Sequence, residues 1–349
     1  MQHKIGENKY VRGTDDVYFI GYWIVKLIFL RNIFLDYVFP IFASWGNIRS
    51  SRKSLRFCEV GWMCLYYTVM WTIGMKVMYD SPYWLNTKNL YAGYPEDHIT
   101  MPYGLKWFYL VQLAFWIQNL HIIYVEERRK DHYEMLTHHF ITIALVTASY
   151  QSHFTRWGHV FMVIMDAPDI FLTLAKVLRY MGFNSLCNYV FAMFTGSWFI
   201  NKHYLCFIMM WSIWTEAEDL IPEEKRYPNN AQSYATYPLM YGFLALLCLL
   251  QCILIFWLWL LLKVLKRAIS GEQIEDNRSD TETSEDASVS SKNNNANSTT
   301  EKNQECEISN PIKTKPSASN SLLYLSLAVC TFGVLYHYYP LLVHVAFYR

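Results

Sequence analysis

Long apolar stretches separated by short polar loops fill the first 268 residues of the chain. A helix that crosses a bilayer needs about 20 mainly apolar residues, because each backbone amide must find its hydrogen-bond partner within the segment. Seven stretches fit or approach this length: 17–42, 58–78, 105–125, 136–150, 157–178, 189–214 and 237–262. The pattern predicts an all-α, polytopic integral membrane protein with seven transmembrane helices.

The chain changes character after residue 268. Residues 269–320 are rich in Ser, Asn, Thr and Glu and hold few large apolar side chains. They bury too little surface to offset the entropy of ordering, so we expect a disordered linker. Residues 321–349 are apolar again but contain His337 and Pro340. This segment is either an eighth transmembrane helix or a helix that lies in the membrane interface.

Lys and Arg are concentrated in every second loop. They follow the first stretch (Arg49, Arg52, Lys53, Arg56), the third (Arg128, Arg129, Lys130), the fifth (Arg179) and the seventh (Lys263, Lys266, Arg267). Because basic loops favour the cytosolic side, we expect the amino terminus outside the cytosol and the linker 269–320 inside it. The chain then divides into 1–57 with the first crossing and a basic loop, 58–268 with six crossings, the linker 269–320 and the segment 321–349.

Composition and charge narrow the function classes. Charged residues make up 17% of the chain, below the roughly 25% of soluble domains, which agrees with a membrane protein. The net charge of +1 gives no electrostatic reason to expect a nucleic-acid partner. The eight cysteines lack the paired spacing of a metal site.

Ionisable side chains stand inside two neighbouring predicted helices. The fourth contains His138 and His139, and Thr142 and Ser149 share the side of His138. In the fifth, a polar stripe at helical spacing follows one face: Asp166, Asp169, Thr173 and Lys176. Such groups are costly within a bilayer, so their presence predicts a functional site by default.

A structural explanation exists for each group alone. A single membrane histidine more often serves as a packing hydrogen-bond partner, and the aspartates could pair with Lys176. The coincidence of two histidines and two aspartates on adjacent antiparallel helices favours a site instead. An imidazole that contacts a carboxylate is a general base near neutral pH, or a nucleophile toward an activated acyl group. We therefore predict His138, His139, Asp166 and Asp169 as catalytic residues.

Other polar residues are candidates for substrate contacts: Gln118, Asn119, Thr142, Ser149, Tyr150, Arg156, Thr173 and Lys176. Gln118 and Asn119, with Gln112, are more typical of hydrogen bonds between helices. A further polar belt, Asn201 to His203 in the sixth stretch, receives no role.

The run from Trp116 to Glu216 resembles the TLC domain of ceramide synthases, especially the fungal members. The matching segments are WIQN, EERRKDH, THHFITIALVTASYQSHFTRWG, MDAPDIFLTLAKVLRY and VFAMF. The order and the spacing of the tandem His and the Asp pair are those of the family. In many animal members a histidine stands at Met165, so any role of that histidine is missing here. The segment 321–349 falls outside the family pattern.

The resemblance implies transfer of a fatty acyl group from acyl-CoA to the amine of a sphingoid base, with no cofactor and no metal. It implies a six-helix TLC barrel within 58–268 and an endoplasmic reticulum membrane location with a luminal amino terminus. It also implies a small single-span regulatory subunit and a homo- or heterodimer as partners.

Other classes fit less well. Fatty-acid elongases carry an HxxHH box, and Met135 takes the place of its first histidine. Membrane desaturases and hydroxylases need several histidine clusters for two irons, and one tandem pair is present. A non-catalytic lipid-sensing or translocation-associated TLC protein, or a transporter with a proton relay, would not need both pairs.

Overall fold

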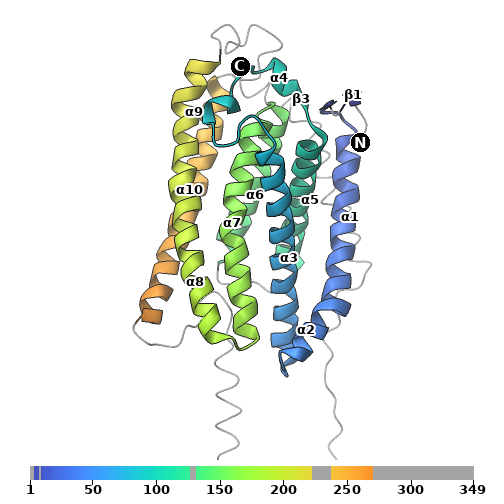
Figure 1. The fold of residues 1–349 in the computed structure, drawn as a ribbon, viewed down its shortest axis with the longest axis vertical. Helices are drawn as coiled ribbons and strands as arrows, with labels where there is room; N and C mark the ends of the chain where they lie inside the picture. The colour runs from blue at the N-terminus through green and yellow to red at the C-terminus, as the bar shows by residue number, and fades with distance from the viewer. Residues whose placement is uncertain (1–3, 8, 126–130, 222–236, 270–349) are drawn as a thin grey trace, which may run out of the picture.

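The computed structural model describes residues 4–7, 9–125, 131–221 and 237–269, and these are mostly helical (Figure 1). Apart from Ile269, the predicted linker 269–320 and the segment 321–349 lie outside the described residues. The long helices are α1 (Asp16–Ile33), α3 (Ser51–Tyr79), α5 (Tyr103–Val125), α6 (His132–Gln151), α7 (Thr155–Tyr180), α8 (Asn184–Trp198), α9 (Cys206–Leu220) and α10 (Tyr237–Ile269). They follow the predicted apolar stretches in order.

Two π-helical turns interrupt these rods. The first, η1 (Phe34–Val38), joins α1 to the short α2 (Phe39–Trp45), and the second, η3 (Phe199–Leu205), joins α8 to α9. In the described ranges, two helices, Tyr103–Val125 and Leu239–Arg267, are long and apolar enough to cross a bilayer by length and composition alone. Several of the others carry ionisable side chains or are divided at a π-helical turn, so the number of crossings stays a prediction.

A small antiparallel sheet departs from the all-α prediction. Its strands β1 (Lys4–Gly6), β2 (Lys9–Val11) and β3 (Thr100–Met101) pair in that order, with Tyr10 opposite Met101. Strands of two or three residues are too short for an alternating pattern to reveal, and β3 is distant in sequence. Two short helical turns, η2 (Thr87–Leu90) and α4 (Glu96–Ile99), precede β3.

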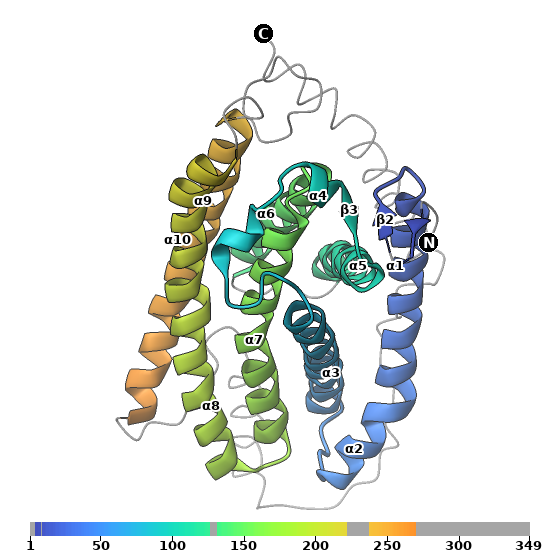
Figure 2. The same cartoon turned by 45° about the horizontal axis from the view of Figure 1, so that its top comes forward.

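The helices form a ring. In the described part of the chain, α3 packs against α5 and α7, α7 against α8, α9 against α10, α10 against α6, and α6 against α5. Helix α1 packs against α5 from outside the ring, as Figure 2 shows. The middle of α5 is therefore covered on several sides, and Phe108, Tyr109 and Phe115 are fully buried. A helix that is apolar around its circumference is expected to be buried in this way.

A glycine allows α3, α5 and α7 to approach closely. A Cβ atom at Gly74 would lie 2.7 Å from a methyl carbon of Val163 and 2.8 Å from the Phe108 ring. Real Cβ atoms do not come so close to a neighbour, so this crossing requires the missing side chain.

A buried ion pair attaches α1 to the ring. Lys106 Nζ lies 2.7 Å from Asp16 Oδ1, and the two side chains are 0% and 4% exposed. Tyr150 donates to Asp16 Oδ2 at 2.6 Å, and Lys106 also donates to the Val11 carbonyl oxygen at 2.7 Å. This Asp16 cluster (Asp16, Lys106, Tyr150) joins α1, α5, α6 and the sheet at one end of the bundle. The turns at α2 and between α7 and α8 lie at the opposite end (Figure 1).

Candidate active site

The paired histidines lie in the first half of α6. His139 is 5% exposed, and its Nδ1 lies 2.8 Å from the carbonyl oxygen of Met135, one turn earlier. A carbonyl oxygen only accepts, so Nδ1 carries the proton and Nε2 keeps its lone pair. His138 Nδ1 is buried and has no hydrogen-bond partner in the described structure. The site thus holds the His139 imidazole, whose tautomer is fixed, and the His138 imidazole, whose Nδ1 has no hydrogen-bond partner in the described structure.

Two tryptophans surround these imidazoles. The Trp116 ring contacts both imidazoles edge to face, and its ring centroid lies 5.6 Å from that of His138 and 5.2 Å from that of His139. Trp257 of α10 contacts His138 at 5.2 Å between centroids. The aromatic walls exclude water from the imidazoles, and charges formed there are weakly screened.

Asp166 lies on the ring-facing side of α7 and is 3% exposed. Its Oδ2 accepts a hydrogen bond of 2.5 Å from Gln112 Nε2 of α5. The other amide atom, Gln112 Oε1, accepts from Tyr66 of α3 at 3.3 Å. Three helices therefore fix this carboxylate. Pro168 follows two residues later, and α7 continues through it as a helix.

Asp169 has a different partner. Its Oδ2 lies 2.9 Å from Lys202 Nζ, and the two side chains are 19% and 7% exposed. Lys202 belongs to η3 and also stacks over the Trp198 ring at 5.1 Å. The turn η3 packs against α10, whose Trp257 contacts His138, and Asp166 precedes Asp169 by one turn of α7. The five side chains of this polar centre (His138, His139, Asp166, Asp169, Lys202) thus come from α6, α7 and η3 into one region.

The expected direct contact between imidazole and carboxylate is not formed. No hydrogen bond joins either histidine to Asp166 or Asp169, all of which are described. Each carboxylate is held by a side chain from another helix, and His139 by its own backbone. The prediction was wrong here because helical spacing gives the face of a residue but not the partner that reaches it.

The predicted substrate contacts are spread over the molecule. The hydroxyls of Thr142 and Thr173 donate to carbonyl oxygens of their own helices, at His138 and Asp169. The Ser149 hydroxyl bonds Tyr109, and Tyr150 belongs to the Asp16 cluster.

The remaining candidates differ in their surroundings. Lys176 is half-buried on α7. The Gln118 amide atoms Nε2 and Oε1 and Asn119 Nδ2 are buried without a hydrogen-bond partner in the described structure. Gln118 and Asn119 follow Trp116 on α5 by less than one turn, which places them near the histidines along the helix.

Arg156 holds a loop. Its guanidinium donates to the carbonyl oxygens of Asn89 and Ala92 at 3.2 Å each and of Asp97 at 3.3 Å. Burial and the nearby Arg156 charge lower the pKa of His98 in this loop to about 4. The guanidinium thus organises the connection between α3 and α5, at the far end of the bundle from His138.

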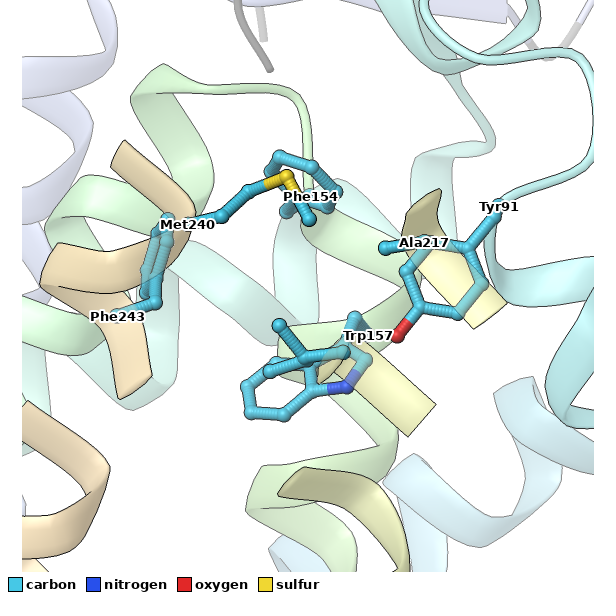
Figure 3. Close-up of a pocket in the computed structure, with 7 residues that line it drawn as sticks. Tyr91, Phe154, Trp157, Ala217, Met240 and Phe243 are labelled. Carbon is cyan, nitrogen blue, oxygen red and sulfur yellow. The ribbon is translucent and has the colours of Figure 1, made fainter. Parts of the chain in front are cut away.

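An apolar cavity lies near that same end (Figure 3). Met240 and Phe243 of α10, Trp157 of α7, Ala217 of α9 and Phe154 line it, and Tyr91 closes it from the loop. The last residue of α6, Gln151, is 13 residues beyond His138 or about 20 Å along the helix at 1.5 Å per residue, and Phe154 follows shortly after it. In the described ranges, no three His, Cys, Asp or Glu side chains are grouped as metal ligands.

Sequence reasoning missed one residue of this site and the partner of another. The prediction that Gln112 bonds between helices is confirmed, but its partner Asp166 was not predicted, and Lys202 had no role. The signal for Lys202 was present, because a lysine inside an apolar stretch needs a counter-charge. Asp169 is 33 residues earlier in the chain, and that separation hid the pair.

Comparisons with known proteins show the family to which the chain belongs. Residues 56–263 match the TLC domain family. The chain is 34% identical over 294 residues to sphingosine N-acyltransferase lag1 of Schizosaccharomyces pombe, covering 84% of this chain and 74% of the relative. It is 33% identical over 287 residues to ceramide synthase LAG1 of Saccharomyces cerevisiae (81% and 68%). It is 30% identical over 247 residues to ceramide synthase LOH1 of Arabidopsis thaliana (68% and 77%).

Proposed function

The chain belongs to the TLC-domain family of ceramide synthases and is an acyltransferase, and from this premise we propose that it joins a fatty acyl group from acyl-CoA to the amine of a sphingoid base. The observation that carries the proposal is the polar centre inside the helix ring. It combines an imidazole with a free Nε2 lone pair and two carboxylates in a site from which water is largely excluded.

The reaction has two chemically open routes. In one, imidazole takes a proton from the ammonium or amine, the amine nitrogen attacks the thioester carbon, and the carbon–sulfur bond breaks. In the other, imidazole attacks first and holds the acyl group until the amine displaces it. In both, a carbon–nitrogen bond replaces the carbon–sulfur bond, and the CoA thiolate leaves and takes up the proton that the amine loses.

The carboxylates act through their charge. When the imidazole becomes positive during transfer, Asp166 and Asp169 stabilise it across a medium of low dielectric constant. Gln112 and Lys202 fix the two carboxylates beforehand, so no reorganisation is needed at that moment.

The ends of the bundle suit the two substrate chemistries. The basic residues 128–130 precede α6, and His138 follows within the first two turns, so a charged CoA headgroup needs to pass only a short distance. The cavity at the other end is lined by apolar side chains, which match the chemistry of a hydrocarbon chain. We infer seven crossings of the endoplasmic reticulum membrane, a luminal amino terminus and cytosolic basic loops. A small single-span subunit and a homo- or heterodimer remain proposed partners.

The test is amide synthesis by membranes from cells without endogenous ceramide synthase. With the chain expressed, a long-chain base and a mixture of acyl-CoA lengths should yield N-acyl amides by mass spectrometry, and the chain-length distribution gives the preference. Membranes without the chain are the control. If correctly inserted protein with its natural partners forms no amide, a non-catalytic lipid-sensing role becomes the better explanation.

A further inference from the structure

Lys202 is a cation without an assigned role in the interior of the helix ring. Its side chain is 7% exposed, and it stands about midway along the rod made of α8, η3 and α9. A lysine at such a depth is energetically costly, so it is expected to have a function beyond packing. The residues around Lys202 indicate which function this is.

The contacts of Lys202 leave donors unused. An ammonium group has three N–H donors. In the described structure one of them goes to Asp169 Oδ2 at 2.9 Å, and the group rests on the Trp198 ring. Asp169 and Trp198 together hold Nζ in place. Two N–H groups therefore remain for an acceptor that enters the site.

The π-helical turn positions this side chain. A π-turn adds a residue to the helical repeat, and such turns occur mostly as single turns inside α-helices, frequently at functional sites. In η3 the turn brings Lys202 beside α7 while the neighbouring Tyr204 and Phe199 stay exposed on the outer side. The helix thus places one charge inside an otherwise apolar and aromatic surface.

The Lys202 charge also reaches the reacting groups. It contacts Asp169 directly, and Asp166 precedes Asp169 by one turn of α7. The turn η3 also packs against α10, whose Trp257 contacts His138 at 5.2 Å between ring centroids. An acyl carbon attacked next to these imidazoles would develop negative charge on its oxygen within the range of Lys202. A positive donor at that position is worth far more in a dry site than in water.

We propose that Lys202 is a catalytic residue that donates a hydrogen bond to the acyl carbonyl oxygen and stabilises its negative charge during transfer. This inference rests on the proposed acyl transfer. The amine or imidazole nitrogen adds to the carbonyl carbon, and the π electrons move to the oxygen, which Lys202 stabilises without giving up its proton. The electrons return as the carbon–sulfur bond breaks, and the thiolate leaves with them.

The test compares Lys202→Met with Lys263→Met. Lys263 also stacks on a tryptophan one turn earlier, at 3.2 Å from the Trp259 ring, but it is exposed on α10 and is a matched control. For Lys202→Met we expect kcat to fall about 10²-fold, as on removal of an oxyanion donor, with KM for acyl-CoA changed less than threefold. Lys263→Met should keep wild-type kinetics. A folded Lys202→Met variant with more than a third of the wild-type kcat overturns the proposal.

A second pair covers the case in which Lys202→Met fails to fold. Both Lys202→Arg and Lys202→Gln can still bond Asp169, but only arginine keeps the charge. We expect Arg to retain at least tenfold more kcat than Gln at equal thermal stability. Equal kcat values for the two variants overturn the proposal. Wild-type membranes that form no amide would instead contradict the proposed function itself, so the two failures are distinguishable.

Discussion

The bond from His139 Nδ1 to the Met135 carbonyl oxygen presets the chemistry of its imidazole. Because both residues belong to α6, the bond does not depend on how the other helices move. The lone pair on Nε2 is therefore available before any substrate arrives, and the tautomer needs no carboxylate partner. His138, which lacks such a bond at Nδ1, is free to change its hydrogen bonding when a substrate enters.

Single substitutions in the polar centre should separate chemistry from folding. We expect His138→Ala, His139→Ala, Asp166→Asn and Asp169→Asn each to lower turnover at least about 10²-fold, because each removes a proton acceptor or a fixed charge. Expression should stay near that of the wild type. Phe140→Leu, an exposed position on α6, is the control. Amide formation and protein level measured in the same membranes decide the outcome.

Wild-type turnover in all four variants would contradict the site, and loss of protein instead of turnover would favour a packing role. At this scale the sequence predicted that Gln112 bonds between helices, but neither its partner Asp166 nor the pair of Lys202 with Asp169, and the catalytic role of the histidines and aspartates stays a prediction. Helical periodicity tells which face a residue occupies. The partner depends on how two helices are rotated against each other, and a single sequence does not contain that information.

The attachment of α1 to the ring depends on one charge pair. Lys106 and Asp16 are almost completely buried, and removal of one member leaves the other charge without compensation. The surrounding contacts from Tyr150 and Val11 belong to two other elements, α6 and β2. The pair therefore joins pieces of chain that are about ninety residues apart in sequence.

We expect Lys106→Met to destabilise the protein by about 3–5 kcal/mol, as for a broken buried ion pair. Lys76, whose partner Asp80 lies one turn later, is the control, since these side chains are 72% and 54% exposed. Lys76→Met should leave the melting temperature unchanged, because exposed pairs contribute little. Thermal unfolding in detergent measures both, and equal melting temperatures would show that the Asp16 cluster does not anchor α1.

The elements themselves were largely predictable. Apolar length located every long helix in the described ranges, from α1 to α10. The π-helical turns and the sheet were not, because η3 contains neither Gly nor Pro to mark a break in the helix and β3 holds only two residues. The Asp16 cluster was also hidden, since Asp16 is 134 residues from Tyr150, which was predicted as a substrate contact.

The whole molecule has two chemically different ends. One end carries the small sheet, the Arg156 contacts and the apolar cavity, and the other carries the α2 and α7–α8 turns (Figure 1). Among the described residues, the basic stretch 49–56 stands between α2 and the start of α3, and Arg179 stands in the last turn of α7, at the second of these ends. An orientation with the sheet in the lumen is the one that the distribution of Lys and Arg favours.

Glycosylation tests this orientation. Lys88→Thr completes an Asn-x-Thr sequon at Asn86, an exposed position in the loop before β3. We expect the variant to gain an endoglycosidase-sensitive glycan, since only luminal sequons are modified. The native sequons at Asn277 and Asn297 should stay unmodified in the wild type, as cytosolic positions. A glycan on the wild type and none added by the substitution would reverse the assignment.

Arg156 recognises its loop through the main chain alone. All three oxygens that it binds, at Asn89, Ala92 and Asp97, are peptide carbonyls, which every amino acid provides. The side chains of that loop can therefore be exchanged without loss of the guanidinium contacts, provided that the path of the backbone is kept. A foreign loop with the same backbone path should keep these guanidinium contacts, whereas no loop sequence could replace a missing arginine.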